Sequence, residues 1–233
     1  MNYGKVLIDG DIVAYRSAFA SQQDGEQDAK NKADDLVTYI LESTALFPEP
    51  DDYQVYLTGK TNFRFDIAKS HVYKGNRKDA EKPRHLGAVR DHLIDNWGAV
   101  VSEDQEADDL IAIDAARQDY NACVASIDKD MLQIPCWHFN FVKGTMVKVD
   151  AFEGIKFFYT QILTGDKADN IVGLYKVGPV KAGKILDGCD DEDDLWDAVL
   201  KAYDGDVGRV VENARLLWLR RFEGEMWLPP SMR

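Results

Sequence analysis

Short apolar runs of strand length alternate with helical periodicity over the first 150 residues. The runs that predict strands are Lys5–Ile8, Tyr53–Leu57, Ala99–Val101 and Ala122–Ile127. The segments with apolar residues at helical spacing are Ile12–Phe19, Ala33–Phe47, Leu86–Trp97 and the run that follows Glu106. Trp137–Val142 and Met146–Val149 flank Lys143-Gly144-Thr145, which predicts a hairpin. This alternation is typical of an α/β domain with a largely parallel sheet.

Two other stretches lack strand or helix patterns of this kind. Ser21–Asn31 is polar and is predicted to be a loop, and Lys60–Pro83 is predicted to be a long basic loop or arch. After Asp150 we expect no further strands and only helices. The sequence therefore predicts a three-layer α/β body over residues 1–150 and a helical part over residues 151–233.

Charge is segregated along the chain. The net charge of −13 by itself argues against a protein that binds nucleic acid. However, nine acidic residues belong to the candidate site clusters described below, and the rest of the chain carries only −4. The stretch from Lys60 to Arg90 has nine basic and three acidic residues. A basic surface for an anionic partner is therefore compatible with the acidic total.

Acidic clusters stand at the ends of several predicted elements. Asp9-Gly-Asp11 and Asp128-Lys-Asp130 follow apolar strands, and Glu106-Ala-Asp-Asp109 begins a helix. Acids in a first helical turn also suit the positive end of the helix dipole, so capping remains an alternative for the last cluster. Carboxylates that crowd together repel one another unless a cation lies among them, and ligands gather at the carboxyl ends of parallel strands. Because the clusters contain oxygen ligands and no His or Cys, they favour Mg²⁺.

A glycine-rich turn follows a further acidic cluster, Gly165-Asp-Lys-Ala-Asp-Asn170. It runs from Gly173 to Lys184, and we expect a helix to open at Pro179, since proline suits the first helical position. Backbone amides at such a start, with lysines nearby, can bind phosphate. An ordinary connection between two helices is the alternative.

The remaining composition narrows the class of protein. The three cysteines are far apart and odd in number, which is typical of reduced thiols in an intracellular protein, so we expect a cytoplasmic location, in the host cytoplasm if the protein is viral. The four histidines show no zinc spacing. No apolar run approaches a membrane span, and the N-terminus shows no signal-peptide pattern, so no membrane partner is expected.

Taken together and in order, these motifs resemble the flap endonuclease superfamily, most closely the bacteriophage and bacterial 5′→3′ exonucleases. The matching segments are Asp9 after a strand, Tyr73-Lys-Gly-Asn-Arg77, Glu106-Ala-Asp-Asp109, Ser126-Ile-Asp128-Lys-Asp130, and Gly165–Asn170 with its glycine turn. The resemblance implies a PIN-like α/β body with a basic arch at about 60–83. It also implies a helix-three-turn-helix element at about 162–186 that grips duplex phosphates and holds a potassium ion.

The resemblance also implies roles for individual residues. The tighter metal cluster would comprise Asp9, Glu106, Asp108, Asp128 and Asp130, and the looser one Asp109, Asp166 and Asp169. Lys74 and Arg77 would reach the scissile phosphate, and Tyr73 would either stack on a frayed base or pack locally. The other implied DNA-binding residues are Lys78, Gly173, Lys176, Gly178, Lys181 and Lys184. We expect Asp11 to cap a helix instead of binding metal.

The implied activity is structure-specific hydrolysis of DNA from 5′ ends and flaps by two or more Mg²⁺ ions, with Mn²⁺ as a substitute, leaving 5′-phosphates. The setting would be phage-type replication, primer removal or degradation of host DNA, by a monomer that also accepts RNA–DNA hybrids. One departure is that family members commonly carry another Asp after the second strand, where this chain has Thr58-Gly59. The alternatives are a haloacid-dehalogenase-like phosphatase with Asp9 as nucleophile and a non-catalytic DNA-binding relative.

Overall fold

The chain folds into two units, which are described one at a time. The computed structural model describes residues 3–44, 52–77 and 81–233. Met1–Thr61 and Glu81–Val149 form the first unit, here called the body, and Asn62–Ala80 and Asp150–Arg233 form the second, here called the helical unit. Residues 62–80, expected within an arch of the body, therefore group with the C-terminal helices.

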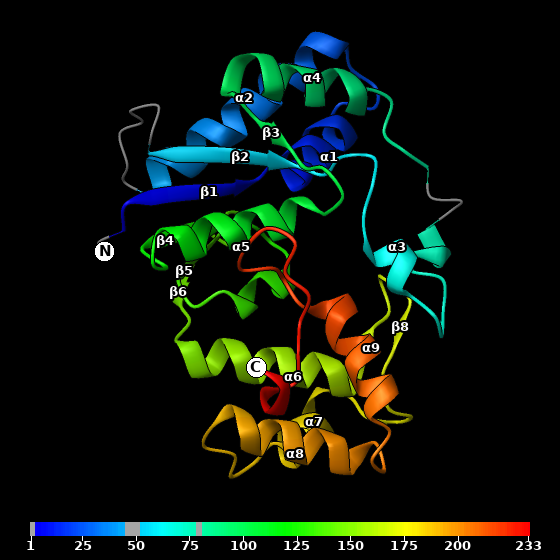
Figure 1. Cartoon of the computed structure of the whole chain (residues 1–233). Helices are drawn as coiled ribbons and strands as arrows, with labels where there is room; N and C mark the ends of the chain where they lie inside the picture. Colours follow the sequence, from blue (N-terminus) through cyan, green and yellow to red (C-terminus); the bar gives the residue numbers. More distant parts are fainter. Residues whose placement is uncertain (1–2, 45–51, 78–80) are drawn as a thin grey trace. The chain divides into compact units, whose positions relative to one another are not determined.

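The body is built around a six-stranded sheet (Figure 1). Its strands are β1 (Lys5–Asp9), β2 (Tyr53–Leu57), β3 (Val100–Val101), β4 (Ala122–Ala125), β5 (Trp137–Asn140) and β6 (Thr145–Lys148). Its helices are α1 (Gly10–Ala20), α2 (Glu26–Ser43), α4 (Leu86–Trp97), α5 (Ala107–Arg117) and the 3-10 helix η2 (Lys129–Gln133). The strand order is β3-β2-β1-β4-β5-β6, with the predicted hairpin β5–β6 as the antiparallel pair. The expected α/β body is confirmed.

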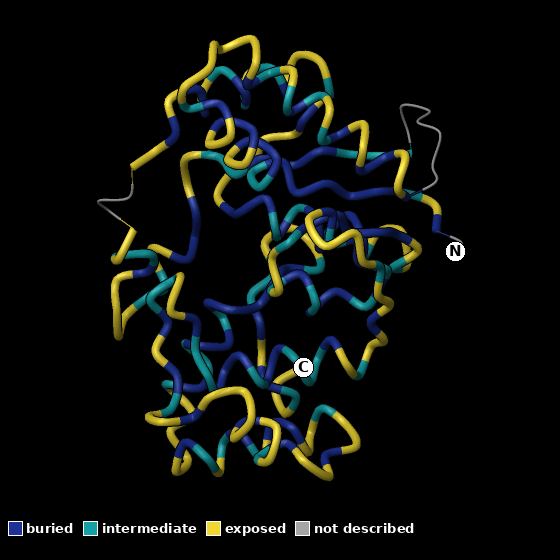
Figure 2. The backbone as a smooth tube through the Cα atoms, turned by 180° about the vertical axis from the view of Figure 1, so that it is seen from behind, coloured by how far each residue is buried: buried dark blue, intermediate teal, exposed yellow. Residues whose placement is uncertain are grey.

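Alternating side chains bury both faces of the central strands. In β1, Val6 and Ile8 belong to the core that also contains apolar residues of α1, α2 and α4, whereas Leu7 lies outside that cluster although it is fully buried. The other face meets α5, where the Tyr56 hydroxyl donates a hydrogen bond to Asp114 over 2.7 Å. Figure 1 shows α1, α2 and α4 on one side of β1 and β2, and α5 on the other. The strands in the middle of the body are correspondingly dark blue in Figure 2. This is the three-layer arrangement that period-two burial predicts.

The direction of chain progression across the sheet reverses beside β1. The chain moves outward from β1 to β2 and β3, and then returns to place β4 along the other side of β1, both neighbours being parallel to it. In open parallel sheets the crevice at the carboxyl end of such a switch point is where ligands bind. Asp9 is the last residue of β1, so the fold places it there.

The polar stretch expected to be a loop is partly helical. α2 begins at Glu26, so the prediction of a loop up to Asn31 is wrong over its second half. Ala29 is fully buried and continues the helical series of Ala33 and Val37 toward the N-terminus, which accounts for the longer helix. The expected end of this helix at Phe47 lies outside the described residues.

The helical unit contains α3 (Arg64–Ile67), the 3-10 helix η1 (Gly75–Arg77), α6 (Ala151–Thr164), α7 (Pro179–Ile185), α8 (Glu192–Ala202), α9 (Val207–Leu217) and the 3-10 helix η3 (Pro230–Met232). It also contains a short antiparallel pair, β7 (Gly165–Asp166) and β8 (Ile171–Val172), so the prediction that strands stop after Asp150 is wrong. A Cβ on Gly173 would lie 2.3 Å from the Thr164 carbonyl carbon, and this close approach requires glycine. Among the described residues, no helix is both long enough and apolar enough to cross a membrane.

The core of the helical unit is aromatic. Phe158 on α6 is fully buried and packs edge-on against Trp218, with ring centroids 4.9 Å apart. The fully buried Arg64 donates hydrogen bonds from its guanidinium to the carbonyl oxygens of Leu216 (2.9 Å) and Trp218 (2.7 Å). These bonds attach the start of the 62–80 segment to the end of α9. The segment is therefore part of this unit's packed structure.

Candidate functional site

Asp9 is a buried carboxylate at the carboxyl end of the central strand. Only 2% of the residue is exposed. Its Oδ1 accepts a hydrogen bond from the Ile12 N–H (3.1 Å), so Asp9 is the N-cap of α1, and its Oδ2 accepts one from the Ser126 hydroxyl (2.7 Å). The prediction that Asp11 caps a helix is wrong. Asp11 lies in the first turn of α1 and pairs with Arg90 over 2.5 Å.

Ser126 joins the Asp9-Gly-Asp11 cluster to the Asp128-Lys-Asp130 cluster. Its Oγ donates to Asp9 and accepts the N–H of Asp128 over 3.0 Å. Asp128 in turn accepts the N–H of Asp130 (2.9 Å) as the N-cap of η2, and Asp130 pairs with the Lys129 ammonium over 2.6 Å. The sequence interpretation gave Ser126 no role. A hydroxyl two residues before an acidic strand end is a weak signal, because it needs the neighbouring strand to give it a partner.

The environment of Asp9 disfavours its charged form. Burial raises the pKa of Asp9 to about 7, and the nearby carboxylates of Asp11 and Asp128 push it in the same direction, against the hydrogen bonds from Ser126 and Ile12. A divalent cation bound here would relieve both the desolvation and the repulsion. The all-oxygen donor set is the one that Mg²⁺ prefers. The chemistry of these donor groups therefore suits a divalent cation.

The acidic residues at the start of α5 also cap the helix. Glu106 is the N-cap of the helix, and its N–H donates to Asp109 Oδ2 (3.0 Å), so the two residues form a reciprocal capping box. Asp109 is fully buried, Glu106 is nearly so, and Asp108 between them is half-buried. The capping alternative is thus correct for Glu106 and Asp109, and it leaves a metal role for this cluster as a prediction. Within residues 3–44, 52–77 and 81–233, no three Asp, Glu, His or Cys side chains lie close enough together to hold a metal ion.

In the helical unit, Asp166 and Asp169 lie in one tight turn. Asp166 Oδ1 accepts the backbone N–H groups of Ala168 (2.6 Å) and Asp169 (3.2 Å), which fixes the turn. Asp169 accepts the Tyr73 hydroxyl (2.8 Å) and pairs with Arg77 (2.5 Å) and Lys74 (3.8 Å). The predicted catalytic cations and a predicted metal ligand are therefore brought together as ion pairs.

The basic segment is held to this turn along its length. The Lys74 N–H donates to the Asp169 carbonyl oxygen over 2.9 Å. The Asn76 side-chain amide donates to the Lys167 carbonyl oxygen over 2.7 Å. In the reverse direction, the Asn170 side chain donates to the Val72 carbonyl oxygen over 2.9 Å. Sequence reasoning missed both asparagines, although they stand inside the two quoted motifs.

Tyr73 is packed inside the helical unit. It is 3% exposed and meets Phe65 edge-on with ring centroids 5.5 Å apart. Of the two alternatives for this residue, the structure shows local packing, and a base could stack on Tyr73 only after it moved. Lys78, a predicted DNA contact, lies outside the described residues.

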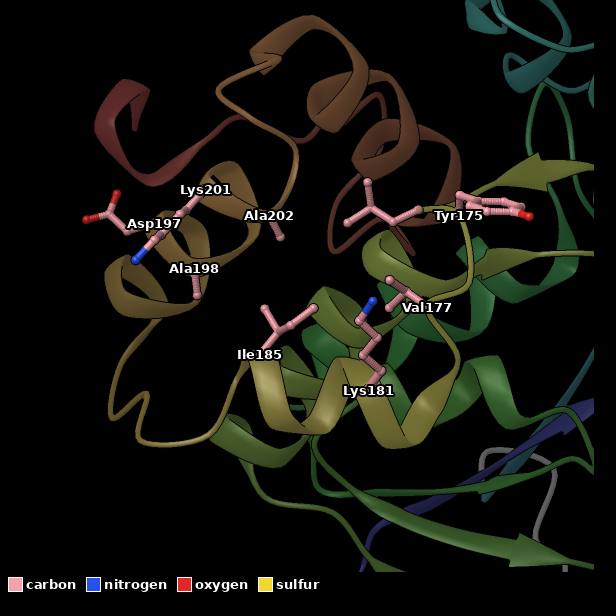
Figure 3. A pocket seen from close by; sticks show the side chains of 9 residues that line it. Tyr175, Val177, Lys181, Ile185, Asp197, Ala198, Lys201 and Ala202 are labelled. Atoms are coloured by element: carbon pink, nitrogen blue, oxygen red, sulfur yellow. The ribbon is translucent and has the colours of Figure 1, made fainter.

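The glycine turn opens α7 as expected. Gly178 is its N-cap and Pro179 its first residue. The predicted phosphate contacts on this turn and helix, Lys176, Lys181 and Lys184, are all exposed. Lys181 and Ile185 of α7 face Asp197, Ala198 and Lys201 of α8 across an open pocket of about 790 Å³ (Figure 3), and Tyr175 on its rim is 83% exposed. The structure thus presents lysines and an exposed aromatic ring along one stretch of the helical unit.

Comparison with known proteins identifies the family. The family model described as "5'-3' exonuclease, N-terminal resolvase-like domain" matches residues 5–167. The chain is 31% identical over 211 residues to DNA polymerase I of Streptococcus pneumoniae, covering 78% of this chain and 23% of that protein. It is 28% identical over 206 residues to a 5'-3' exonuclease of Mycoplasma genitalium, covering 78% of this chain and 70% of the relative. The chain thus spans about a quarter of the length of the polymerase relative.

Solved structures show the same fold. The D15 protein of bacteriophage T5, co-crystallised with metal ions, superposes with a TM-score of 0.72 at 15% identity, covering 91% of this chain and 88% of that one. The catalytic core of Rad2 in complex with a DNA substrate gives a TM-score of 0.56 at 14% identity over 99% of this chain and 84% of that one. The chain belongs to the family of 5′–3′ exonuclease N-terminal, resolvase-like domains, in agreement with its motifs.

Proposed function

We propose that this chain hydrolyses DNA phosphodiesters from 5′ ends and flaps with bound Mg²⁺, leaving 5′-phosphates. The observation that carries the proposal lies at the switch point of the parallel sheet. There, Ser126 Oγ links the Asp9 carboxylate to the backbone N–H of Asp128. The raised pKa of Asp9 supports it, because a crowded buried carboxylate is costly to maintain unless a cation neutralises it.

In this proposal Asp9 and Asp128 hold the first cation together with Glu106, Asp108 and Asp130. Asp109 of the body, and Asp166 and Asp169 of the helical unit, are the further candidate ligands. Bound divalent ions supply an acidified water and neutralise the charge that develops on the leaving oxygen. Ser126 donates to the Asp9 carboxylate and accepts the backbone N–H of Asp128, and the capping box fixes the first turn of α5 from which the other acids project. Asp128→Asn therefore removes one metal ligand without disturbing the bond from Ser126 to Asp9.

Lys74 and Arg77 stabilise the negative charge of the transition state in this proposal. Their ion pairs with Asp169 support the role, because the pairs keep two cations ordered before substrate binds. The DNA phosphate then competes with the Asp169 carboxylate for the same cations. A divalent ion at Asp169 would favour that exchange by taking over the carboxylate.

In this proposal the helical unit binds the duplex part of the substrate. The side chains of Lys176, Lys181 and Lys184 and the backbone of Gly173 and Gly178 contact the DNA phosphates. The support is that these lysines are exposed and close in sequence. The division of labour is a nuclease body over residues 1–61 and 81–149 and a DNA-binding helical unit over residues 62–80 and 150–233, with K⁺ at the turn between β8 and α7.

We also propose a substitute metal, a further substrate class and a cellular setting. Mn²⁺ substitutes for Mg²⁺, RNA–DNA hybrids are further substrates, and the chain acts as a monomer in the cytoplasm during phage-type replication, primer removal or degradation of host DNA. They rest on the family resemblance and on the wide spacing in the sequence of the three buried cysteines, Cys123, Cys136 and Cys189.

The test uses a 5′-labelled flap, a 5′-labelled blunt duplex and a 3′-labelled duplex, incubated with Mg²⁺ or with EDTA. We expect short 5′-labelled products with Mg²⁺ only, and none with Asp128→Asn. Loss of nucleotides from the 3′ end, or undiminished cutting in EDTA, would contradict the proposal. Release of phosphate from small phosphate esters without DNA cleavage would indicate the phosphatase alternative, and metal-independent binding without cutting would indicate the non-catalytic one.

A further inference from the structure

Thr58, at the end of β2, is bound through each of its polar groups to a different helix of the body. Its Oγ1 accepts the N–H of Ala107, the first residue of α5, over 3.0 Å. Its N–H donates to Asp11 Oδ2 in the first turn of α1 (3.0 Å). Its carbonyl oxygen accepts a hydrogen bond from Arg90 of α4 over 2.6 Å. One residue thus connects the starts of two helices to the middle of a third.

Arg90 completes this connection. One end of its guanidinium binds Asp11 Oδ1 (2.5 Å) and the other binds the Thr58 carbonyl oxygen, so the planar group is fixed at two points. Both side chains of the ion pair are 24% exposed, which limits screening by solvent. The corner between the ends of β1 and β2 is therefore held by the protein's own cation.

The hydroxyl of Thr58 adds to the capping box at the start of α5. The first N–H groups of a helix have no partner within the helix, and Thr58 supplies one for Ala107. The next residue reinforces the position, because the Gly59 N–H donates to Ser102 Oγ (3.0 Å) and a Cβ on Gly59 would lie 2.0 Å from the Ser102 carbonyl oxygen. The capping residue Glu106 immediately precedes Ala107, so its place relative to Asp9 depends on this contact.

We propose that Thr58 is a positioning residue, which holds the starts of α1 and α5, and with them Asp9 and Glu106, in the arrangement that binds a divalent cation. The inference rests on the proposed metal-dependent nuclease function. Threonine performs this task without charge, through its hydroxyl oxygen, its N–H and its carbonyl oxygen.

The test measures Ca²⁺ binding to the DNA-free chain by calorimetry for Thr58→Val and Thr58→Ser. Valine has nearly the shape of threonine and lacks the acceptor for the Ala107 N–H, whereas serine retains it. We expect Thr58→Val to weaken Ca²⁺ binding about tenfold, the order for loss of a group that orients ligands. The Ca²⁺ affinity of Thr58→Ser should lie within about twofold of that of the unmodified chain. The Mg²⁺ concentration for half-maximal cleavage should rise in parallel, and excess Mg²⁺ should recover the rate.

Thr61→Val is the matched control. Thr61 Oγ1 accepts the N–H of Asp104 over 2.9 Å, so this change removes the same kind of bond to the same 102–107 segment, away from the first turn of α5. We expect its Ca²⁺ affinity to equal that of the unmodified chain. All measurements are made well below the lowest melting temperature of the set, so that every variant is folded.

Unchanged Ca²⁺ affinity in Thr58→Val, with or without a lower melting temperature, would overturn the positioning role and leave the nuclease proposal intact. Equal weakening by Thr58→Val and Thr61→Val would overturn it as well, because a general loosening of the loop would explain both. No Ca²⁺ binding by the unmodified chain would overturn the proposed metal site together with this inference.

Discussion

Replacing Asp9 by Asn should stabilise the metal-free protein while it abolishes cleavage. Asp9 is 2% exposed, and burial together with Asp11 and Asp128 raises its pKa from an ordinary 3.8 to about 7. The folded state therefore binds the Asp9 proton more tightly than the unfolded state does. The resulting contribution to stability is complete below pH 4 and is lost as the pH rises through 7. A shift of this size corresponds to about 4 kcal/mol.

An asparagine avoids this loss because it never ionises. Its side-chain oxygen can still accept the Ile12 N–H, and its amide can donate to Ser126 Oγ, so the cap and the link to β4 are retained. Relative to the variant, the unmodified chain should lose about 3 kcal/mol of unfolding free energy between pH 5 and pH 8 in EDTA. Adding Mg²⁺ at pH 8 should stabilise the unmodified chain and leave the variant nearly unchanged.

The assay is urea unfolding in EDTA at half-unit steps of pH, together with a carbon-13 NMR titration of the Asp9 carboxyl. Asp206→Asn is the control, since Asp206 caps α9 from an exposed position, accepting the Arg209 N–H over 3.1 Å. A stability difference between the Asp9→Asn variant and the unmodified chain that does not change with pH would refute the reasoning. So would an Asp9 carboxyl that titrates near pH 4.

Three further outcomes follow from the site. Lys74→Ala should lower the single-turnover cleavage rate at saturating DNA by about 10²-fold, the order for one lost electrostatic donor, and a loss of affinity with the saturated rate intact would make Lys74 an ordinary phosphate contact. The double variant Lys181→Ala with Lys184→Ala should weaken duplex binding and reduce the salt slope of the binding constant by up to about 2. The control pair Lys143→Ala with Lys148→Ala, on the β5–β6 hairpin, should leave the slope unchanged. Equal slopes for the two double variants would contradict the duplex role. Asp128→Asn should abolish cutting while metal-free DNA affinity holds steady or rises, because a carboxylate near a phosphate costs roughly 1 kcal/mol or more at intermediate dielectric, and cutting near the unmodified rate would remove Asp128 from the metal site.

The sequence predicted the elements whose pattern is local. Period-two and helical spacing identified the strands and most helices of the body, and the position of Asp9 and Asp128 after strands placed them at one edge of a parallel sheet. The hydrogen bonds through Ser126 agree with that placement. What the pattern could not give is the partner of each polar group, since Asp11 is bound by Arg90, 79 residues away in the chain.

The grouping of residues 62–80 was also beyond local patterns. Their low apolar content predicted an arch, but Arg64 is buried against carbonyl oxygens at the end of α9, 152 residues further along. A buried arginine that satisfies backbone acceptors looks in sequence like any other basic residue of a charged loop. Likewise, Glu106 and Asp109 could be assigned to capping or to metal binding only after the hydrogen bonds of the capping box were known.

The neutralisation of the carboxylates differs between the clusters, and this difference indicates where a cation is needed most. Asp11 is neutralised by Arg90, Asp130 by Lys129, and Asp169 by Arg77 and Lys74. By contrast, burial, two hydrogen bonds and two neighbouring carboxylates set the pKa of Asp9, and no lysine or arginine is among these causes. A divalent ion gains most where the charge is buried and lacks an internal counter-charge. The strongest requirement for a cation therefore lies at Asp9. A cation at Asp169 must first displace the side chains of Arg77 and Lys74.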